Sequence, residues 1–178
     1  MNIYKTRNDF ISTLDQNLIM CEIGVFKGDF SQILFNTSPK ELHLIDPFIG
    51  GFWSGDKDGL NMQYANLEIS YQYLKNLYSN YDYVRIHKGY GQHILQKFSD
   101  HYFDFMYIDA DHTYDSVKND LEICKKKTKI NGIISGHDYD NNKFPGVVRA
   151  VNEFCSKYNL NIFALTQDGC PTFGIINI

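Results

Sequence analysis

The chain has 178 residues, of which 43% are hydrophobic and 21% are charged, as in an ordinary globular protein. A chain of this length can bury most of its apolar surface in one core, so residues 1–178 are expected to form a single domain. The formal net charge of -4 lacks the basic excess with which proteins contact nucleic-acid phosphates, and no nucleic-acid partner is expected.

The sequence also predicts where the protein resides. No apolar run approaches the ~20 residues of a membrane span, and residues 1–16 lack the apolar core of a signal peptide. The four cysteines are scattered without a C-x-x-C pair, which is typical of reduced thiols in a cytosolic compartment. We therefore expect a soluble, cytoplasmic protein with no membrane partner.

The first predicted elements surround a glycine turn. Apolar spacing predicts a helix over residues 3–16, and the apolar run at 18–23 predicts a strand that carries Glu22 near its end. Gly24 and Gly28 follow in the spacing G-x-x-x-G, which differs from the G-x-G-x-x-G of dinucleotide sites. The carboxylate of Glu22 would repel a pyrophosphate but suits a ligand with a cationic ammonium or sulfonium group. The turn therefore argues against NAD, although an ordinary strand-to-helix turn explains the same residues.

The second predicted strand, residues 41–46, ends in an acidic side chain. Asp46 lies about 20 residues after the glycine turn, where an acidic residue of a doubly wound sheet accepts hydrogen bonds from the two ribose hydroxyls of a nucleoside. The alternative is a turn aspartate placed before Pro47.

A glycine-rich loop follows at residues 47–60. It carries Phe48, Phe52 and Trp53, which makes it either a candidate substrate lid or a surface loop whose aromatic rings dock on the core. An amphipathic helix, a third strand and a turn into a further helix are predicted next, at residues 61–79, 83–87 and 88–91.

Acidic and histidine side chains follow the next two predicted strands. These strands cover residues 103–108 and 129–135, and they lead into Asp109, Asp111 and His112 and into His137 and Asp138, respectively. Because open parallel sheets place ligands at the carboxyl ends of their strands, we expect these side chains to converge. Carboxylates with one imidazole suit Mg²⁺, Mn²⁺ or Fe²⁺, and the absence of cysteine from these runs argues against a thiolate-bound zinc ion.

The last predicted elements complete the fold. A helix over residues 146–158 precedes two strands, at 161–165 and 172–176, whose short connection favours an antiparallel hairpin. The alternating order of strands and helices predicts an α/β fold: a Rossmann-like, doubly wound, seven-stranded and mostly parallel sheet that ends in this antiparallel hairpin.

Longer runs of sequence resemble a known family. They are E-I-G-V-F-K-G at the turn, L-I-D-P-F after the second strand, I-D-A-D-H-T-Y-D-S-V-K-N-D-L at 108–121, N-G-I-I-S-G-H-D-Y at 131–139 and G-V-V-R-A-V from Gly146. Together they resemble class I S-adenosylmethionine (SAM)-dependent methyltransferases, in the small-molecule O-methyltransferase branch that includes relatives of macrocin O-methyltransferase and cephalosporin-type tailoring proteins. The resemblance spans roughly residues 18–176.

The resemblance implies a cofactor site. SAM would have its ribose on Asp46 and its adenine against the turn at residues 88–91, where Tyr90 could stack on the base or Gln92 could bond its edge. The implied cofactor-binding residues are Glu22, Gly24, Gly28, Asp46, Tyr90 and Asp109.

The resemblance also implies catalytic and metal-binding roles. Asp109, His137 and Asp138 would hold a divalent ion, preferably Mg²⁺, and Asp111 would be the general base. Some relatives carry a carboxylate where this chain has His137, so His137 is an alternative base that acts without a metal. In the plainer interpretation, His112 and His137 are hydrogen-bonded structural residues and Asp111 caps the following helix.

The predicted function is methyl transfer from SAM to a hydroxyl of a small molecule or sugar, with a divalent ion as an option (EC 2.1.1.-). The alternative is a module with a methyltransferase fold that binds SAM or a nucleoside without turning it over.

Overall fold

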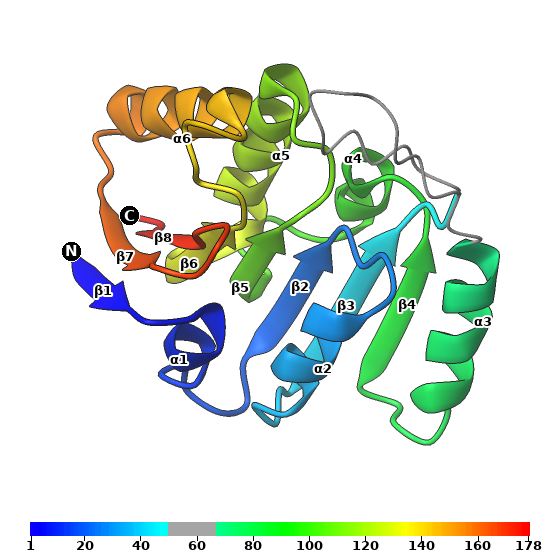
Figure 1. The fold of residues 1–178 in the computed structure, drawn as a ribbon. Coiled ribbons are helices and arrows are strands. Elements are labelled where there is room, and N and C mark those ends of the chain that lie inside the picture. The colour runs from blue at the N-terminus through cyan, green and yellow to red at the C-terminus, as the bar shows by residue number, and fades with distance from the viewer. Residues whose placement is uncertain (50–66) are drawn as a thin grey trace.

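The computed structural model describes residues 1–49 and 67–178. At its centre lies an eight-stranded sheet in the order β1-β7-β8-β6-β5-β2-β3-β4 (Figure 1). The strands are β1 (Asn2–Tyr4), β2 (Ile19–Ile23), β3 (Glu41–Asp46), β4 (Val84–Lys88), β5 (Phe103–Ile108), β6 (Thr128–Gly136), β7 (Ile162–Thr166) and β8 (Phe173–Ile176). The helices are α1 (Arg7–Ile11), α2 (Asp29–Phe35), α3 (Leu67–Leu77), α4 (Gly91–Ile94), the 3-10 helix η1 (Leu95–Lys97), α5 (Tyr114–Lys127) and α6 (Pro145–Tyr158).

Strand directions confirm the predicted fold class. The paired strands are parallel except at β8, which inserts between β6 and β7 and runs antiparallel to both. This is the predicted C-terminal hairpin on a mostly parallel, Rossmann-like sheet. None of the helices described at residues 1–49 and 67–178 is both long and apolar enough to cross a bilayer.

The N-terminal segment differs from the prediction, because it adds an eighth strand to the expected seven. Asn2–Tyr4 pairs in parallel with β7, and of the helix expected over residues 3–16 only α1 forms. A capping box sets the start of α1: Thr6 accepts a hydrogen bond from the backbone N–H of Asp9, and the Asp9 carboxylate accepts one from the backbone N–H of Thr6. The residues before Thr6 are therefore free to extend and pair with the sheet.

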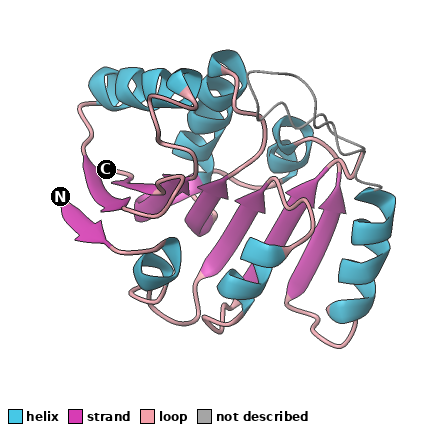
Figure 2. Cartoon of the chain, viewed as in Figure 1, coloured by secondary structure: helices cyan, strands magenta, loops and turns pink. Residues whose placement is uncertain are grey.

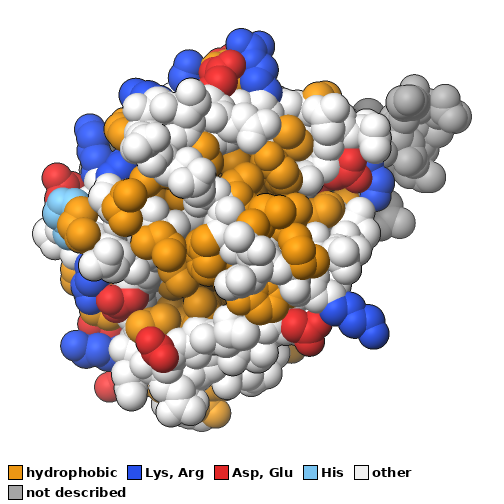
Figure 3. Space-filling view, turned by 90° about the vertical axis from the view of Figure 1, so that its left-hand side faces the viewer, with side chains coloured by type: hydrophobic (Ala, Val, Ile, Leu, Met, Phe, Trp, Pro, Cys, Tyr) orange, Lys and Arg blue, Asp and Glu red, His pale blue; other side chains and the backbone are white. Residues whose placement is uncertain are grey.

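The new strand forms one edge of the sheet. Figure 3 faces the side of the molecule where β1 lies and shows hydrophobic side chains gathered there. Met1 and Ile3 are among the exposed hydrophobic residues. A three-residue edge strand is short, which limits pairing with other chains.

Helices cover both faces of the sheet (Figure 2). Phe10 of α1, Leu34 of α2 and Leu74 of α3 belong to the core on one face. Leu121 of α5 and Val151 of α6 belong to the core on the other face. Because helices shield both faces, the central strand β2 is buried along its whole length.

The glycine-rich loop lies mostly outside the described residues. Phe48, at its start, is buried and packs with its ring centroid 5.1 Å from that of Tyr71. Phe52 and Trp53, on which the predicted substrate lid depends, are outside the described residues, as is the first part of the helix expected over 61–79.

The topology places a switch point at β2. This strand pairs with β3 on one side and with β5 on the other, and all three run in the same direction. The connections that follow β2 and β5 therefore run to opposite sides of the sheet. Open α/β sheets bind ligands at their carboxyl edge where the strand order reverses in this way.

A histidine pair joins β3 and β4, with His43 buried and His87 half-buried. His43 Nδ1 lies 3.0 Å from His87 Nε2, and His43 Nε2 lies 3.0 Å from Glu41 Oε2. Tyr102 also donates a hydrogen bond to Glu41, at 2.7 Å. Burial lowers the pKa of both imidazoles, to about 4 in His87.

This pair predicts a loss of stability in mild acid. The unfolded chain takes up a proton at His87 near pH 6.5, whereas the folded chain does so only near pH 4, so the free energy of unfolding decreases as the pH falls through this window. Because His87 is only half-buried, we expect it to contribute on the order of 2 kcal/mol. Urea unfolding at pH 7 and pH 4.5 should show this difference in the wild type and a smaller one in His87→Gln. The exposed His93→Gln is the control, and an unchanged pH dependence in His87→Gln would contradict the assignment.

Candidate active site at the carboxyl ends of the strands

The glycine turn after β2 is shaped by close backbone contacts. Gly24 has a φ of +91°, and a Cβ atom there would lie 2.0 Å from the carbonyl oxygen of Asp109. Gly28 has a φ of +88°, and its Cβ atom would lie 2.4 Å from a methyl group of Leu74. Only glycine combines a left-handed backbone with such approaches, so Gly24 lets the loops after β2 and β5 meet.

Asp46, at the end of β3, holds this turn in place through hydrogen bonds to its backbone. Its Oδ2 accepts hydrogen bonds from the backbone N–H groups of Val25 and Phe26, at 2.9 and 3.0 Å. Its Oδ1 accepts one from Phe48, at 2.6 Å. A carboxylate has about four acceptor positions, and within residues 1–49 and 67–178 one position on Oδ1 is without a donor and suits a ligand hydroxyl. The predicted ribose contact at Asp46 is thus limited to that oxygen.

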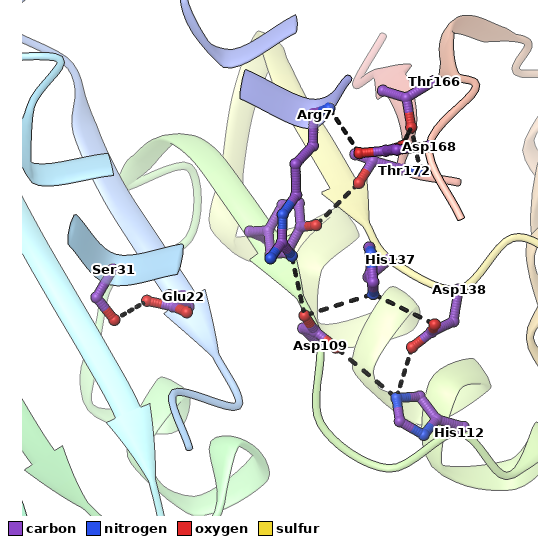
Figure 4. A network of polar contacts seen from close by, with 11 residues as sticks. Arg7, Glu22, Ser31, Asp109, His112, His137, Asp138, Thr166, Asp168 and Thr172 are labelled. Atoms are coloured by element: carbon purple, nitrogen blue, oxygen red, sulfur yellow. Dashed lines mark hydrogen bonds and ion pairs between the residues drawn. The ribbon is translucent and has the colours of Figure 1, made fainter. Parts of the chain in front are cut away.

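Glu22 is held differently from the prediction. It is 1% exposed, and its carboxylate accepts a hydrogen bond of 2.5 Å from Ser31 of α2, on the side away from Asp109 (Figure 4). Burial, with repulsion from Asp109 and Asp46, raises the pKa of Glu22 well above its ordinary value. This buried carboxyl group joins α2 to β2, and its raised pKa reduces the negative charge that it offers to a cationic ligand. The predicted direct contact between Glu22 and the ligand therefore stays a prediction, and the burial of Glu22 disfavours that contact.

The side chains after β5 and β6 do converge, as the topology predicts. His137 Nδ1 lies 3.2 Å from Asp138 Oδ1 and 3.7 Å from Asp109 Oδ2. His112 Nε2 lies 2.8 Å from Asp138 Oδ2 and 3.7 Å from Asp109 Oδ1, although its N–H is poorly aligned for a hydrogen bond. Figure 4 shows the four side chains directed toward one another. We call these four residues the acid–histidine cluster.

The acidic and histidine side chains of the cluster shift one another's pKa values. Burial alone would lower the pKa of His112, but Asp109 and Asp138 outweigh it and raise the pKa to about 9. Burial alone would raise the pKa of Asp138, but contacts with His112 and His137 hold it well below its ordinary value. At neutral pH the cluster therefore contains a charged Asp138 paired with a charged His112.

The cluster fits a divalent cation. One donor atom each from Asp109, His137 and Asp138 lies within 4.8 Å of the others. A cavity of about 10 Å³, roughly the space of one water molecule, opens beside Asp109 and His137. Two carboxylates and an imidazole are ligands that suit Mg²⁺, Mn²⁺ or Fe²⁺. These three residues would hold the ion, in competition with His112 for the carboxylates.

Asp111 does not join the cluster. Its Oδ1 accepts a hydrogen bond from the backbone N–H of Thr113 and its Oδ2 accepts one from Ser116, both at 2.9 Å. These contacts outweigh partial burial and lower the pKa of Asp111, which weakens it as a base. Asp111 thus holds the turn that leads into α5, but it does not cap the helix as in the alternative interpretation, because Thr113 is the N-cap residue and α5 has no side-chain cap hydrogen bond.

Tyr90 lies at the N-cap position of α4 and is 56% exposed. Its ring meets that of His93 edge-on, with centroids 6.4 Å apart. Gln92 is also exposed, so stacking by Tyr90 or hydrogen bonding by Gln92 remain predictions for this turn.

Arg7 is a site residue that the sequence did not indicate. Its Nη1 lies 3.8 Å from Asp109 Oδ2, and its guanidinium lies 4.9 Å from the centre of the Phe30 ring. The backbone N–H of Arg7 donates to Asp168 in the β7–β8 turn, at 2.9 Å. The apolar pattern of residues 3–16 predicted a covering helix, but no signal in the sequence linked Arg7 to Asp109.

Comparisons with known proteins agree with this geometry. A family model described as a methyltransferase domain matches residues 21–139. No curated protein sequence matches the chain.

Solved structures share the fold at low sequence identity. A candidate methyltransferase from Streptococcus mutans, in complex with S-adenosylhomocysteine (SAH), is 15% identical with a TM-score of 0.66, over 97% of this chain and 96% of that one. The N-methyltransferase NodS from Bradyrhizobium japonicum is 14% identical with a TM-score of 0.63, over 96% and 92%. An rRNA methylase from Streptococcus thermophilus is 12% identical with a TM-score of 0.61, over 97% and 94%.

These structures are described as different kinds of methyltransferase, and what they share with this chain is the fold. With the match covering most of the chain, and with a glycine turn and an acidic strand end at the switch point, the protein belongs to the class I SAM-dependent methyltransferases.

Proposed function

We propose that the protein transfers a methyl group from SAM to a hydroxyl of a small molecule or sugar, with His137 as the general base. The observation that carries this proposal is the orientation of His137, whose Nδ1 faces the carboxylates of Asp138 and Asp109 at 3.2 and 3.7 Å. An imidazole that keeps its proton on Nδ1, toward carboxylates, presents the lone pair of Nε2 to an acceptor.

The mechanism needs alignment and one proton transfer. The acceptor oxygen attacks the sulfonium methyl group in line, the carbon–sulfur bond breaks, and Nε2 of His137 takes the hydroxyl proton. Asp138 and Asp109 stabilise the imidazolium that results. A divalent ion at Asp109, His137 and Asp138 would supply a second means of lowering the pKa of the hydroxyl, and it would then leave Asp111 as the remaining candidate base.

The preference for a small acceptor is supported by charge. The net charge is -4, and the site is lined by Asp109, Asp111 and the two histidines that pair with Asp138. Such a site would repel an RNA backbone unless cations intervened. We also propose that the single domain acts in the cytoplasm, where its four free cysteines would stay reduced.

The test supplies SAM labelled in its methyl group together with either a metabolite filtrate or rRNA. We expect label in small molecules as methyl ethers and none in RNA. His137→Gln should lower kcat by about 10²–10⁴-fold, whereas the exposed His93→Gln should not change it. Label found only in RNA or on amines would contradict the acceptor class. SAM binding without transfer to any fraction would favour the non-catalytic alternative.

A further inference from the structure

The guanidinium group of Arg7 lies at the site but has no role in the proposed reaction. Its Nη1 lies 3.8 Å from Asp109 Oδ2, which is longer than a hydrogen bond. The nearby Tyr107 hydroxyl is also within hydrogen-bonding distance of Thr172 Oγ1, at 3.0 Å. Within residues 1–49 and 67–178, contacts with Asp109 and Tyr107 can occupy only part of the five N–H donors of a guanidinium. The side chain is 27% exposed, so the remaining donors are accessible to a ligand.

Contacts on two sides hold Arg7 in position. Its guanidinium carbon lies 4.9 Å from the centre of the Phe30 ring, which stacks on the Tyr107 ring with centroids 3.9 Å apart. Its backbone N–H donates a hydrogen bond to Asp168 at 2.9 Å. A cation placed over an aromatic face is attracted to the ring, and an arginine ordered in this way loses less conformational entropy when it binds a ligand. Arg7 therefore offers the site a preorganised cation.

Arg7 and His137 approach the same oxygen atom. Oδ2 of Asp109 lies 3.8 Å from Arg7 Nη1 and 3.7 Å from His137 Nδ1, and Figure 4 shows both side chains directed toward it. The guanidinium and the proposed base are thus neighbours across one carboxylate. A small acceptor that places its hydroxyl at the imidazole can reach the guanidinium with a second group.

The chemistry of the guanidinium restricts that second group. Arginine stays protonated, and its planar fork of N–H donors matches a carboxylate through two parallel hydrogen bonds. Asp109 and Asp138 would repel a phosphate group, which carries nearly two negative charges, more strongly than a carboxylate with one. One guanidinium can balance a single carboxylate, whereas it cannot balance the row of charges along an RNA backbone. The favoured second group is therefore a carboxylate.

We propose that Arg7 binds a carboxylate of the acceptor, so that the acceptor is a hydroxy acid or a sugar acid and not a neutral alcohol or sugar. This inference rests on the proposed methyl transfer and names the acceptor class of that site. Arg7 holds the acceptor by its carboxylate, while His137 takes the proton of its hydroxyl.

The first measurement is the charge of the methylated product. The wild type is incubated with a metabolite filtrate and SAM labelled in its methyl group, and the products are separated by anion exchange at pH 7. We expect the label in methyl ethers that bind the exchanger, before and after treatment with alkaline phosphatase, because a carboxylate is ionised at this pH. Label in products that do not bind, or that stop binding after phosphatase treatment, would overturn the inference.

The second measurement assigns the carboxylate to Arg7. A dilution series of the same filtrate gives KM in relative units. Arg7→Gln should raise KM at least about tenfold and change kcat by less than about threefold, and Arg7→Lys, which keeps the charge but not the planar fork, should lie between. The matched control is Arg149→Gln, which removes an exposed arginine paired with Glu153 and should keep the wild-type KM. An unchanged KM in Arg7→Gln would overturn the inference.

The binding of SAH separates the acceptor from the cofactor, which has a carboxylate of its own. Calorimetry should give Arg7→Gln an affinity for SAH within about threefold of the wild type, with circular dichroism to confirm that the variant is folded. A folded variant that bound SAH about tenfold more weakly or worse would assign the guanidinium to the cofactor and overturn the inference. If the wild type transferred no label at all, the proposed methyl transfer would itself fail, an outcome distinct from label in neutral products.

Discussion

Asp109→Asn should lower kcat by about 10³-fold while leaving the fold intact. The carboxylate lies 3.7 Å from His112 and His137 and 3.8 Å from Arg7, so its charge balances three cationic or protonatable groups. An amide of the same shape removes that charge. His137 is then oriented less well, and its imidazolium is less stabilised. Steady-state kinetics with labelled SAM measure the loss, and circular dichroism confirms the fold.

The control for this variant is Asp100→Asn, which alters an exposed ion pair with Lys127 and should leave kcat unchanged. Activity of Asp109→Asn within about threefold of the wild type would contradict the role of Asp109.

Where a divalent ion takes part, EDTA should lower wild-type activity and added Mg²⁺ should restore it, with little further effect of EDTA on Asp109→Asn. Full wild-type activity in excess chelator would assign the proton transfer to the protein's own groups.

Gly24→Ala should cause the largest loss of stability. The new Cβ atom would lie 2.0 Å from the carbonyl oxygen of Asp109, and the backbone at Gly24 is left-handed. Relief requires the loops after β2 and β5 to separate, and we expect a loss of about 4 kcal/mol in the free energy of unfolding. For a chain of this size that corresponds to a melting temperature lower by about 8–16 °C.

Gly169→Ala is the matched control, because a Cβ atom there would meet nothing within 4 Å. Thermal unfolding of both variants with and without SAH would show whether the turn is also needed for cofactor binding. SAH should raise the melting temperature of Gly169→Ala but not that of Gly24→Ala. A melting temperature of Gly24→Ala within about 2 °C of the wild type would contradict the close approach.

Local patterns were sufficient to predict most of the sheet. Each buried parallel strand is an apolar run that ends in acidic or glycine residues, so the sequence indicated both the strands and their functional edge. Strand β1 has no such pattern. Its three residues become a strand through pairing with β7, near the other end of the chain, and sequence alone does not report such a pairing.

The site was predicted in part for the same reason. The cluster after β5 and β6 follows from topology, because adjacent parallel strands must end together. The direction in which each side chain points does not follow from the topology. Glu22 turns toward Ser31, and Asp111 bonds to Thr113 and Ser116. Arg7 belongs to a helix whose start is bonded to Asp168 in the β7–β8 turn. These contacts join segments whose spacing carries no periodic signal.

Titration calorimetry of the wild-type protein with SAH and, separately, with NAD tests most directly whether the strand ends hold an adenosyl sulfonium cofactor. Binding of SAH at micromolar or tighter affinity, with no heat from NAD, is the predicted result. Heat from NAD and none from SAH would show that the strand ends around β2 accept a dinucleotide, and the proposed methyl transfer would then not stand.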